Sequence, residues 1–421
     1  MKQLKSRKAE LAPNTMGGGK FHAETAARAE FKMTELGPIP VDWEVKRFDE
    51  AYSFAAASDL QKEWYSPIQD ARHKYCIYSN GLSNNGLYGY TSQPRYNGNS
   101  ITITGRGTLG HAEFRHDEFD AIIRLLILTP IVEVDNRFVV YWINNYKPFV
   151  NESTSIPQLT VPQVACKLFP LPPLAEQRRI AGALSDVDEL ISALGKLIEK
   201  KRNIKTGAMQ QLLTGKTRLP GFKGKWEEKY IGEMTSVITG ATPSTARADF
   251  WGGNIRWMSS GELNYKIVSE VEGRITKEGF EACSTHIIPI GCVLIGLAGQ
   301  GKTRGTAAYN LVEMCTNQSI ASILPASSFH SKFLYYYMDC QYDELRLISA
   351  GDGGRGGLTK GDIEKFVIII PPTLAEQKAI AAVLSDMDAE IAALEADRAK
   401  YERIKSGMMQ ELLTGKTRLE A

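Results

Sequence analysis

The sequence predicts an α+β fold: two globular α+β domains alternate with two long helices that form an antiparallel coiled coil. The main observation is an internal repeat, because residues 174–219 and 374–419 align without a gap and are identical at well over half of their positions. The segments before the two copies also open alike, with Trp43-Glu44 in the first and Trp226-Glu227 in the second. Self-similarity of this extent marks the duplication of a whole structural unit.

Each copy of the repeat has the pattern of one long helix. Apolar residues of the first copy step by four and three, as in a coiled-coil seam, at Ile180, Leu184, Val187, Ile191, Leu194 and Ile198. Prolines precede both copies, and Glu176 and Glu376 fall in the first turn, where the helix dipole favours a carboxylate. Each helix is expected to end at Leu213 or Leu413, before a Thr-Gly pair.

The duplication also predicts how the helices pair. The second domain starts soon after the first helix ends, and the second helix starts where that domain finishes. The shortest course of the second helix is back along the first, so we expect an antiparallel pair with pseudo-two-fold symmetry and one domain at each end. About 40 helical residues with a rise of ~1.5 Å each give a rod of about 60 Å.

Between the repeats, short apolar runs of β character are separated by Gly, Asn and Pro, as in mostly antiparallel sheets. These runs are 76–81, 86–92, 100–105 and 138–143 in the first domain, and 255–260, 292–298, 319–325 and 366–370 in the second. Shorter helices are expected at 23–36, 118–128 and 329–349. We therefore predict a partly flexible N-terminal tail at 1–36, globular domains at 37–171 and 220–371, a central helix at 172–219 and a C-terminal helix at 372–421.

Composition limits the function classes. The 421-residue chain has a net charge of +2, so a nucleic-acid surface would be a local patch. Its six cysteines lack the paired spacing of a zinc site and fit free thiols in a reducing compartment. No apolar run has the length of a membrane span, and the N-terminus lacks a signal-peptide pattern. We expect a cytoplasmic protein with no membrane partner.

Residues 296–303 match the phosphate-binding pattern G-x-x-x-x-G-K-T after a strand-like run. In a nucleotide-binding loop of this kind a helix follows at once, because its N-terminal amides hold the phosphates. Here the next residues are Arg304-Gly305-Thr306, which lead into another β-like run. A P-loop ATPase stays as an alternative function, and tight ATP binding that depends on Lys302 would favour it.

A DNA-contacting surface loop is the interpretation that suits this segment better. Small residues allow close approach, while Lys302, Thr303 and Arg304 could meet phosphates or base edges. The first domain has a glycine loop at a matching place, with the candidates Arg106, Thr108, His111 and Arg115. A further glycine loop at 351–357 contains Arg355. We predict these eight residues as DNA-binding; a plain surface hairpin with charged tips is the alternative.

No arrangement of residues indicates catalysis. The aspartates repeated at 186 and 188 and at 386 and 388 lie within the long helices, where such a pair is usually structural. His111 and His116 lack the spacing of a helical metal pair, and no carboxylate–histidine cluster accompanies them. The chain also has no base-flipping methyltransferase motif, convincing nuclease cluster or nucleophile elbow. We expect that this chain binds no cofactor or metal of its own.

Several motifs occur together in this chain. PPLAEQRRI at 172–180 and PPTLAEQKAI at 371–380 precede the helices, LLTGKTRL ends both repeats, and a Trp-Glu pair opens both domains. In this combination, from about Gly37 onward, the chain resembles the specificity subunit of type I restriction-modification enzymes. The first 35 residues lie outside the resemblance.

The resemblance implies a non-catalytic, DNA-binding subunit of a restriction endonuclease and adenine methyltransferase complex in host defence. Each globular domain would be a target-recognition domain that reads one half of a bipartite, asymmetric double-stranded DNA target. The helices would set the spacing and dock two modification subunits, which use S-adenosylmethionine, while restriction subunits use ATP and magnesium. A coiled-coil adaptor whose globular ends bind proteins is a further alternative.

Overall fold

The computed structural model describes residues 30–149, 158–299, 301–349 and 356–419. The chain forms two compact units: unit 1 comprises residues 1–191 and 400–421, and unit 2 comprises residues 192–399. Each long helix contributes one part to each unit, because α4 spans Leu174–Leu212 and α10 spans Leu374–Leu412. The predicted boundaries at 171, 219 and 371 therefore separate sequence segments rather than compact units.

Unit 1 is built on a central antiparallel sheet with the strand order β4-β11-β8-β9. Its strands are β4 (Tyr52–Ala56), β11 (Leu126–Pro130), β8 (Ser100–Ile103) and β9 (Ala112–Arg115). A second sheet has the order β10-β6-β7-β5, with β10 (Phe119–Ala121), β6 (Tyr75–Tyr78), β7 (Leu87–Thr91) and β5 (Tyr65–Ser66). The remaining elements are β1 (Phe31–Thr34), β2 (Gly37–Pro40), β3 (Glu44–Arg47), α1 (Phe48–Ala51), η1 (Lys62–Trp64), η2 (Ser83–Gly86), α2 (Asn136–Tyr146), α3 (Val161–Ala165) and β12 (Leu168–Leu171).

Unit 2 repeats the central sheet with one further strand at its edge, and it has a different second sheet. The order of the central sheet is β14-β21-β18-β19-β16, with β14 (Val237–Thr239), β21 (Ile320–Ile323), β18 (Val293–Gly296), β19 (Ala307–Asn310) and β16 (Ile267–Val268). The second sheet, β17-β15-β20, consists of β17 (Arg274–Ile275), β15 (Trp251–Met258) and β20 (Cys315–Thr316). The other elements are β13 (Glu227–Tyr230), α5 (Ile231–Met234), η3 (Ala248–Phe250), η4 (Ser260–Tyr265), α6 (Lys277–Glu281), α7 (Ser331–Cys340), α8 (Tyr342–Ile348), α9 (Lys360–Glu364) and β22 (Val367–Ile370).

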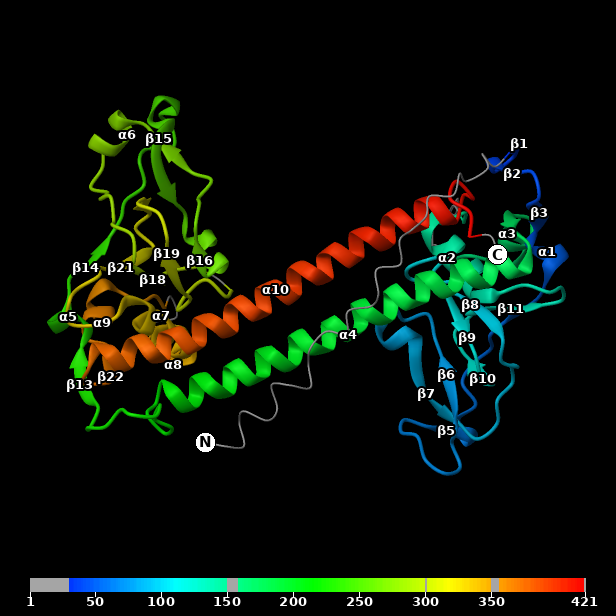
Figure 1. The fold of residues 1–421 in the computed structure, drawn as a ribbon, viewed down its shortest axis with the longest axis horizontal. Coiled ribbons are helices and arrows are strands. Elements are labelled where there is room, and N and C mark those ends of the chain that lie inside the picture. Colours follow the sequence, from blue (N-terminus) through cyan, green and yellow to red (C-terminus); the bar gives the residue numbers. More distant parts are fainter. Residues whose placement is uncertain (1–29, 150–157, 300, 350–355, 420–421) are drawn as a thin grey trace, which may run out of the picture. The chain divides into compact units, whose positions relative to one another are not determined.

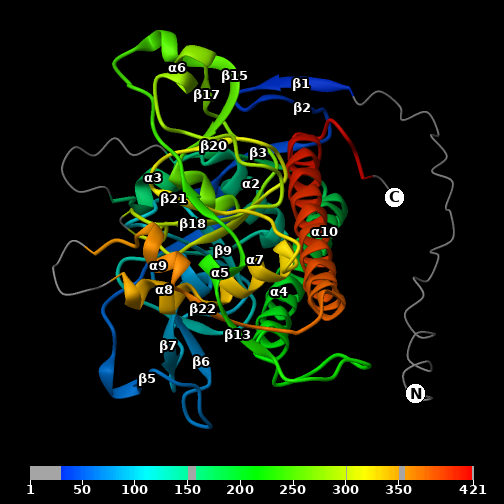
Figure 2. The ribbon, with the colours of Figure 1, turned by 90° about the vertical axis from the view of Figure 1, so that its left-hand side faces the viewer.

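The two long helices confirm the prediction from the repeat. Within each unit, the parts of α4 and α10 that belong to it run side by side (Figure 1 and Figure 2). In unit 1, Lys405 of α10 forms an ion pair of 2.7 Å with Asp188 of α4, while Arg418, after α10, reaches Glu176 at the start of α4. Residue numbers rise from Lys405 to Arg418 while those of their partners fall from Asp188 to Glu176, so the pairing is antiparallel. Past the helix ends, Gly215 and Gly415 both adopt a φ of 69°, which a glycine tolerates.

Each unit has its own hydrophobic core, and both long helices contribute to it. In unit 1, Ile180 and Leu184 of α4 and Leu412 at the end of α10 pack with Trp43 and Phe138. In unit 2 the same places are taken by Ile380, Leu384, Leu212, Trp226 and Phe333. The start of one long helix and the end of the other thus close each core.

Three local predictions are wrong. Residues 31–34, expected to be helical, form strand β1 and pair with β2. Residues 118–128, also expected to be a helix, contribute β10 and the start of β11, since both runs hydrogen-bond to neighbouring strands. Residues 138–143, expected to be a strand, lie in α2, which buries Phe138, Val139, Trp142 and Ile143 on one face and starts after the capping Asp135. The helices expected at 329–349 are confirmed as α7 and α8.

Candidate nucleic-acid interface

The glutamate repeated at the start of both long helices is buried and binds an arginine from the repeated Thr-Arg-Leu ending. Glu176 accepts hydrogen bonds from Arg418, with Nε–Oε1 2.7 Å and Nη2–Oε2 2.8 Å, and from Trp43 Nε1 at 3.0 Å. In unit 2, Glu376 accepts from Arg218, with Nη2–Oε2 2.7 Å. In each unit this glutamate–arginine pair, called the clamp, joins the start of one long helix to the residues just after the end of the other.

The glutamine that follows this glutamate ties the helix start to the globular part. Gln177 accepts from the Asp135 N–H at 2.9 Å and donates to the Pro172 carbonyl oxygen at 2.7 Å. Gln377 makes two similar bonds in unit 2: it accepts from the His330 N–H at 2.7 Å and donates to the Pro371 carbonyl oxygen at 3.0 Å. Both globular parts are therefore fixed to their helices by the same polar contacts.

Of the repeated aspartates inside the helices, Asp188 and Asp388 have the structural role expected from the sequence. The Tyr141 hydroxyl donates to Asp188 Oδ2 at 2.8 Å, and Lys405 pairs with the same carboxylate. The matching group in unit 2 consists of Tyr336, Asp388 and Lys205. Each group joins a globular helix to both long helices.

Against this repeated scaffold, the predicted loop of unit 1 connects β8 and β9. Asn80 Oδ1 holds its start, because it accepts from the backbone N–H groups of Gly105 at 2.7 Å and Arg106 at 3.2 Å. The side chains of Arg106 and Thr108 are exposed, and Arg106 Nη2 donates to Gln158 Oε1 at 3.4 Å. The loop therefore presents one guanidinium and one hydroxyl to solvent on an anchored backbone.

The other two candidates of unit 1 lie outside this loop tip. His111 precedes β9, and its Nε2 lies 2.9 Å from the Glu113 carboxylate. Arg115 ends β9 and is only 6% exposed. Its guanidinium carbon lies 3.6 Å from the centroid of the Tyr78 ring, and its Nε donates to Thr102 Oγ1 at 2.9 Å. A direct contact between Arg115 and DNA stays a prediction, but most of this side chain is engaged within the protein.

The predicted loop of unit 2 occupies the matching place, between β18 and β19. The chain enters strand β19 at Ala307 rather than a helix, so the described residues of this loop are not followed by the helix N-terminus of a phosphate-binding loop. Lys302 is exposed, and the backbone beside it is held by α8: the Tyr342 hydroxyl donates to the Lys302 carbonyl oxygen at 3.3 Å, and Arg346 donates to that of Gly301 at 2.6 Å.

The remaining candidates of unit 2 are less exposed. Thr303 and Arg304 are half-buried, and Arg304 donates to the carbonyl oxygen of Gly356. This contact joins the loop to Gly356, which lies within the second glycine loop. Arg355 itself lies outside the described residues. Of the three candidates at 302–304, Lys302 is thus the one whose side chain is exposed.

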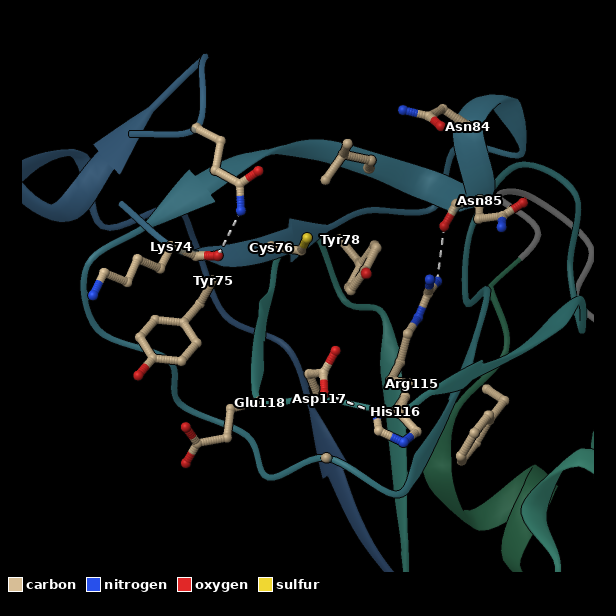
Figure 3. Close-up of a pocket in the computed structure, with 14 residues that line it drawn as sticks. Lys74, Tyr75, Cys76, Tyr78, Asn84, Asn85, Arg115, His116, Asp117 and Glu118 are labelled. Atoms are coloured by element: carbon tan, nitrogen blue, oxygen red, sulfur yellow. Dashed lines mark hydrogen bonds and ion pairs between the residues drawn. The ribbon is translucent and has the colours of Figure 1, made fainter. Parts of the chain in front are cut away.

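A polar pocket in unit 1 was not predicted from the sequence. It has a volume of about 890 Å³ and lies along β6 and β9; polar residues along it are Gln69, Lys74, Tyr75, Asn84, Asn85, Arg115, His116, Asp117 and Glu118. Figure 3 shows Asn84 and Asn85 at one end, Lys74 at the other and Tyr78 between them. Burial raises the pKa of Tyr78 to about 12 and lowers the pKa of Arg115. The Ser-Asn-Asn-Gly run between two β-like runs was the only signal for this turn.

The described residues contain no group of three His, Cys, Asp or Glu side chains that could hold a metal ion. Within the same residues, no helix is long and apolar enough to cross a membrane. The geometry defines a class of protein: a duplicated scaffold held by matching contacts, which carries two different sets of exposed loops. Such an arrangement suits the recognition of two different features by one chain.

Comparison with known families specifies this class. The model of the family described as type I restriction modification DNA specificity domain matches residues 40–203 and 223–405, so each match covers one copy of the duplication. The chain belongs to this family.

Individual relatives agree with the family match. The type I restriction enzyme MjaIX specificity subunit of Methanocaldococcus jannaschii is 31% identical over 169 residues, which are 39% of this chain and only 38% of that protein. The putative MjaX specificity subunit of the same organism is 23% identical over 426 residues, 93% of this chain and 97% of that protein. The crystal structure of a type I restriction-modification S subunit from M. genitalium has a TM-score of 0.64 at 16% identity and covers 90% of this chain and 97% of its own. It shares the fold.

Proposed function

We propose that this chain is the DNA sequence-recognition subunit of a type I restriction-modification enzyme. Each unit reads one half of a bipartite, asymmetric double-stranded DNA target, and the long helices set the spacing of the halves. The chain contributes specificity, while the chemistry belongs to other subunits. Family membership supports this proposal, and so does the contrast between matching scaffold contacts and dissimilar exposed loops.

The partners follow from the same proposal. Two modification subunits dock on the paired helices and methylate adenine with S-adenosylmethionine, and restriction subunits join with ATP and magnesium. This chain itself holds no cofactor, and it acts in the cytoplasm, where its DNA target lies. The two alternatives lack support: residues 296–303 lead into a strand, and a protein-only adaptor does not account for a DNA specificity family.

The DNA-facing residues are part of the proposal. Arg106 and Lys302 are the most exposed cations on the two matching loops, and Thr108 lies beside the first of them. Lys and Arg on such loops bind phosphates and guanine edges. His111, Arg115, Thr303, Arg304 and Arg355 stay as weaker candidates.

The test uses the chain assembled with its modification subunits. Wild type and the variants Arg106→Ala and Lys302→Ala are compared by DNA binding at several salt concentrations and by mapping methylated sites. Lys302→Ala should weaken binding and reduce the salt slope by about 1, as loss of one phosphate contact does. Arg106→Ala should relax or abolish recognition of one half-site only.

Lys223→Ala, an exposed lysine between α4 and β13 and outside both the loops and the long helices, is the matched control and should leave DNA binding unchanged. If both loop variants bind and methylate like wild type, the assignment of these residues is wrong. If the wild-type complex discriminates no DNA sequence, the function itself is wrong.

A further inference from the structure

We propose that the turn between β6 and β7 in unit 1 is a base-reading element, in which the amides of Asn84 and Asn85 recognise an adenine–thymine pair. The inference rests on the proposed DNA function and names residues that read one half-site. Asn84 (φ 50°, ψ 42°) and Asn85 (φ 51°, ψ 32°) are both left-handed, and Gly86 follows with φ 79°.

Asparagine adopts this conformation more readily than other non-glycine residues, but two in succession still carry a cost because their Cβ atoms crowd the backbone. Glycine would adopt the same turn without that strain, so the two amide side chains are presented at a conformational cost. Such strain persists only where surrounding contacts hold the backbone in place.

The surrounding contacts are specific. The Ser79 N–H donates to the Gly86 carbonyl oxygen at 2.8 Å, and a Cβ at Gly86 would lie 2.7 Å from the carbonyl oxygen of Ser79. Arg115 Nη2 donates to the Asn85 carbonyl oxygen at 2.9 Å. Because Arg115 is also fixed by the Tyr78 ring and by Thr102 of β8, it connects the turn to the central sheet.

The amides themselves are exposed at one end of the 890 Å³ pocket. In Figure 3 the Asn84 side chain extends away from Arg115, while the backbone of Asn85 is joined to it. An asparagine amide offers one acceptor and two donors, which match N6 and N7 of adenine in the major groove. A rigid backbone with free amides is therefore suited to reading a base edge.

The charges around the pocket favour bases over phosphates as the ligand. Lys74 is the exposed cation, whereas Asp117 and Glu118 are exposed carboxylates of the same lining, and the His116 ring bonds Asp117 at 2.7 Å. Carboxylates repel phosphates but accept hydrogen bonds from exocyclic amino groups of bases. The mixture of charges in the pocket lining thus favours contacts with base edges in a DNA groove, with Lys74 placed near the DNA backbone.

The experiment measures base preference in the complete complex with its modification subunits. Asn84→Gly and Asn85→Gly remove the amides and relieve the backbone strain, so loss of folding does not confuse the result. We expect about a 10- to 100-fold loss of discrimination at one or two base pairs of a single half-site, as for a lost bidentate contact. Asn85→Asp should shift the preference at its position toward cytosine, because a carboxylate accepts from cytosine N4.

Asn145→Gly, an exposed asparagine on α2, is the control and should leave base preference unchanged. Arg115→Lys should reduce base discrimination at the same base pair as Asn85→Gly. General destabilisation of the unit would instead reduce discrimination at more than one position. An unchanged methylation motif in both glycine variants, or a loss that is equal for all sequences, overturns the inference while leaving the proposed function intact. A wild-type complex without any sequence preference would overturn both.

Discussion

Units 1 and 2 bind their long helices through the same contacts and differ where they face solvent. Both use a buried glutamate with an arginine, a glutamine with a backbone N–H, and a tyrosine with a helical aspartate. Their second sheets have different strand orders, β10-β6-β7-β5 and β17-β15-β20. Contacts that join three elements constrain several side chains at once, whereas an exposed turn constrains few. Divergence between the copies is therefore concentrated in the turns and second sheets, where the proposed DNA contacts lie.

The comparison also reveals an asymmetry within the clamps. Trp43 donates to Glu176, but Trp226 Nε1 is buried without an acceptor among the described residues. Asp42 adds two bonds to Arg418, at 2.9 and 2.6 Å, while the residue before Trp226 is Lys225. The clamp of unit 1 is thus more extensively bonded than that of unit 2.

The largest expected effect tests this asymmetry. Glu176→Ala removes a carboxylate whose side chain is 3% exposed and leaves the Trp43 N–H without its acceptor. Breaking a buried ion pair costs about 3–5 kcal/mol, so unit 1 should lose that amount. Hydrogen exchange measured on peptides of each unit reports the loss separately. Glu376→Ala should cost unit 2 less, and Glu189→Ala, exposed on α4, should cost neither. Equal losses of unfolding free energy for Glu176→Ala and Glu376→Ala would show that the two clamps contribute equally to stability.

A smaller effect tests the equivalence of the two units. Tyr141→Phe and Tyr336→Phe each remove one hydroxyl that donates to a helical aspartate, at 2.8 and 2.7 Å. A hydrogen bond to a charged group contributes about 1.5–3 kcal/mol. We expect similar losses of protection in α2 and α7, each confined to its own unit. Tyr146→Phe, whose half-exposed ring lies at the end of α2, serves as the control. A loss that differs several-fold between the two variants would show that the matching geometry does not carry matching energy.

The smallest effect concerns pH. The hydrogen bonds from Arg418 lower the pKa of Asp42 below its ordinary 3.8. Since the folded-state pKa is lowered, this stabilisation is present above pH 3.8 and is lost as the pH falls below it. Asp42 is partly exposed, so the effect should stay under about 1 kcal/mol. Exchange of the β2–β3 segment at pH 5 and pH 3, corrected for intrinsic rates, measures it. Asp42→Asn should lack this acid dependence; the same dependence in the variant would assign it to other groups.

The sequence predicts the structure well where the chain repeats itself. It does so poorly where contacts with residues far away in the chain determine whether a segment is helix or strand. The long helices, their ends near Leu213 and Leu413 and their antiparallel pairing follow from a repeat of sufficient length. The segments 118–128 and 138–143 were exchanged between helix and strand, because short apolar runs suit both. Of the DNA-binding candidates, Arg106 and Lys302 lie exposed on matching loops, whereas the buried position of Arg115 depends on Tyr78, which lies on another strand.

The sequence by itself determined the duplication, the helical rods and the family, since periodicity and repeated motifs are properties of the chain alone. Only the tertiary structure decided that Glu176 binds Arg418 and Glu376 binds Arg218, rather than partners in the same repeat. It also decided that Arg115 holds the strained turn of Asn84 and Asn85. The physical reason is that hydrogen-bond partners far apart in the chain are chosen by packing, which no local pattern contains.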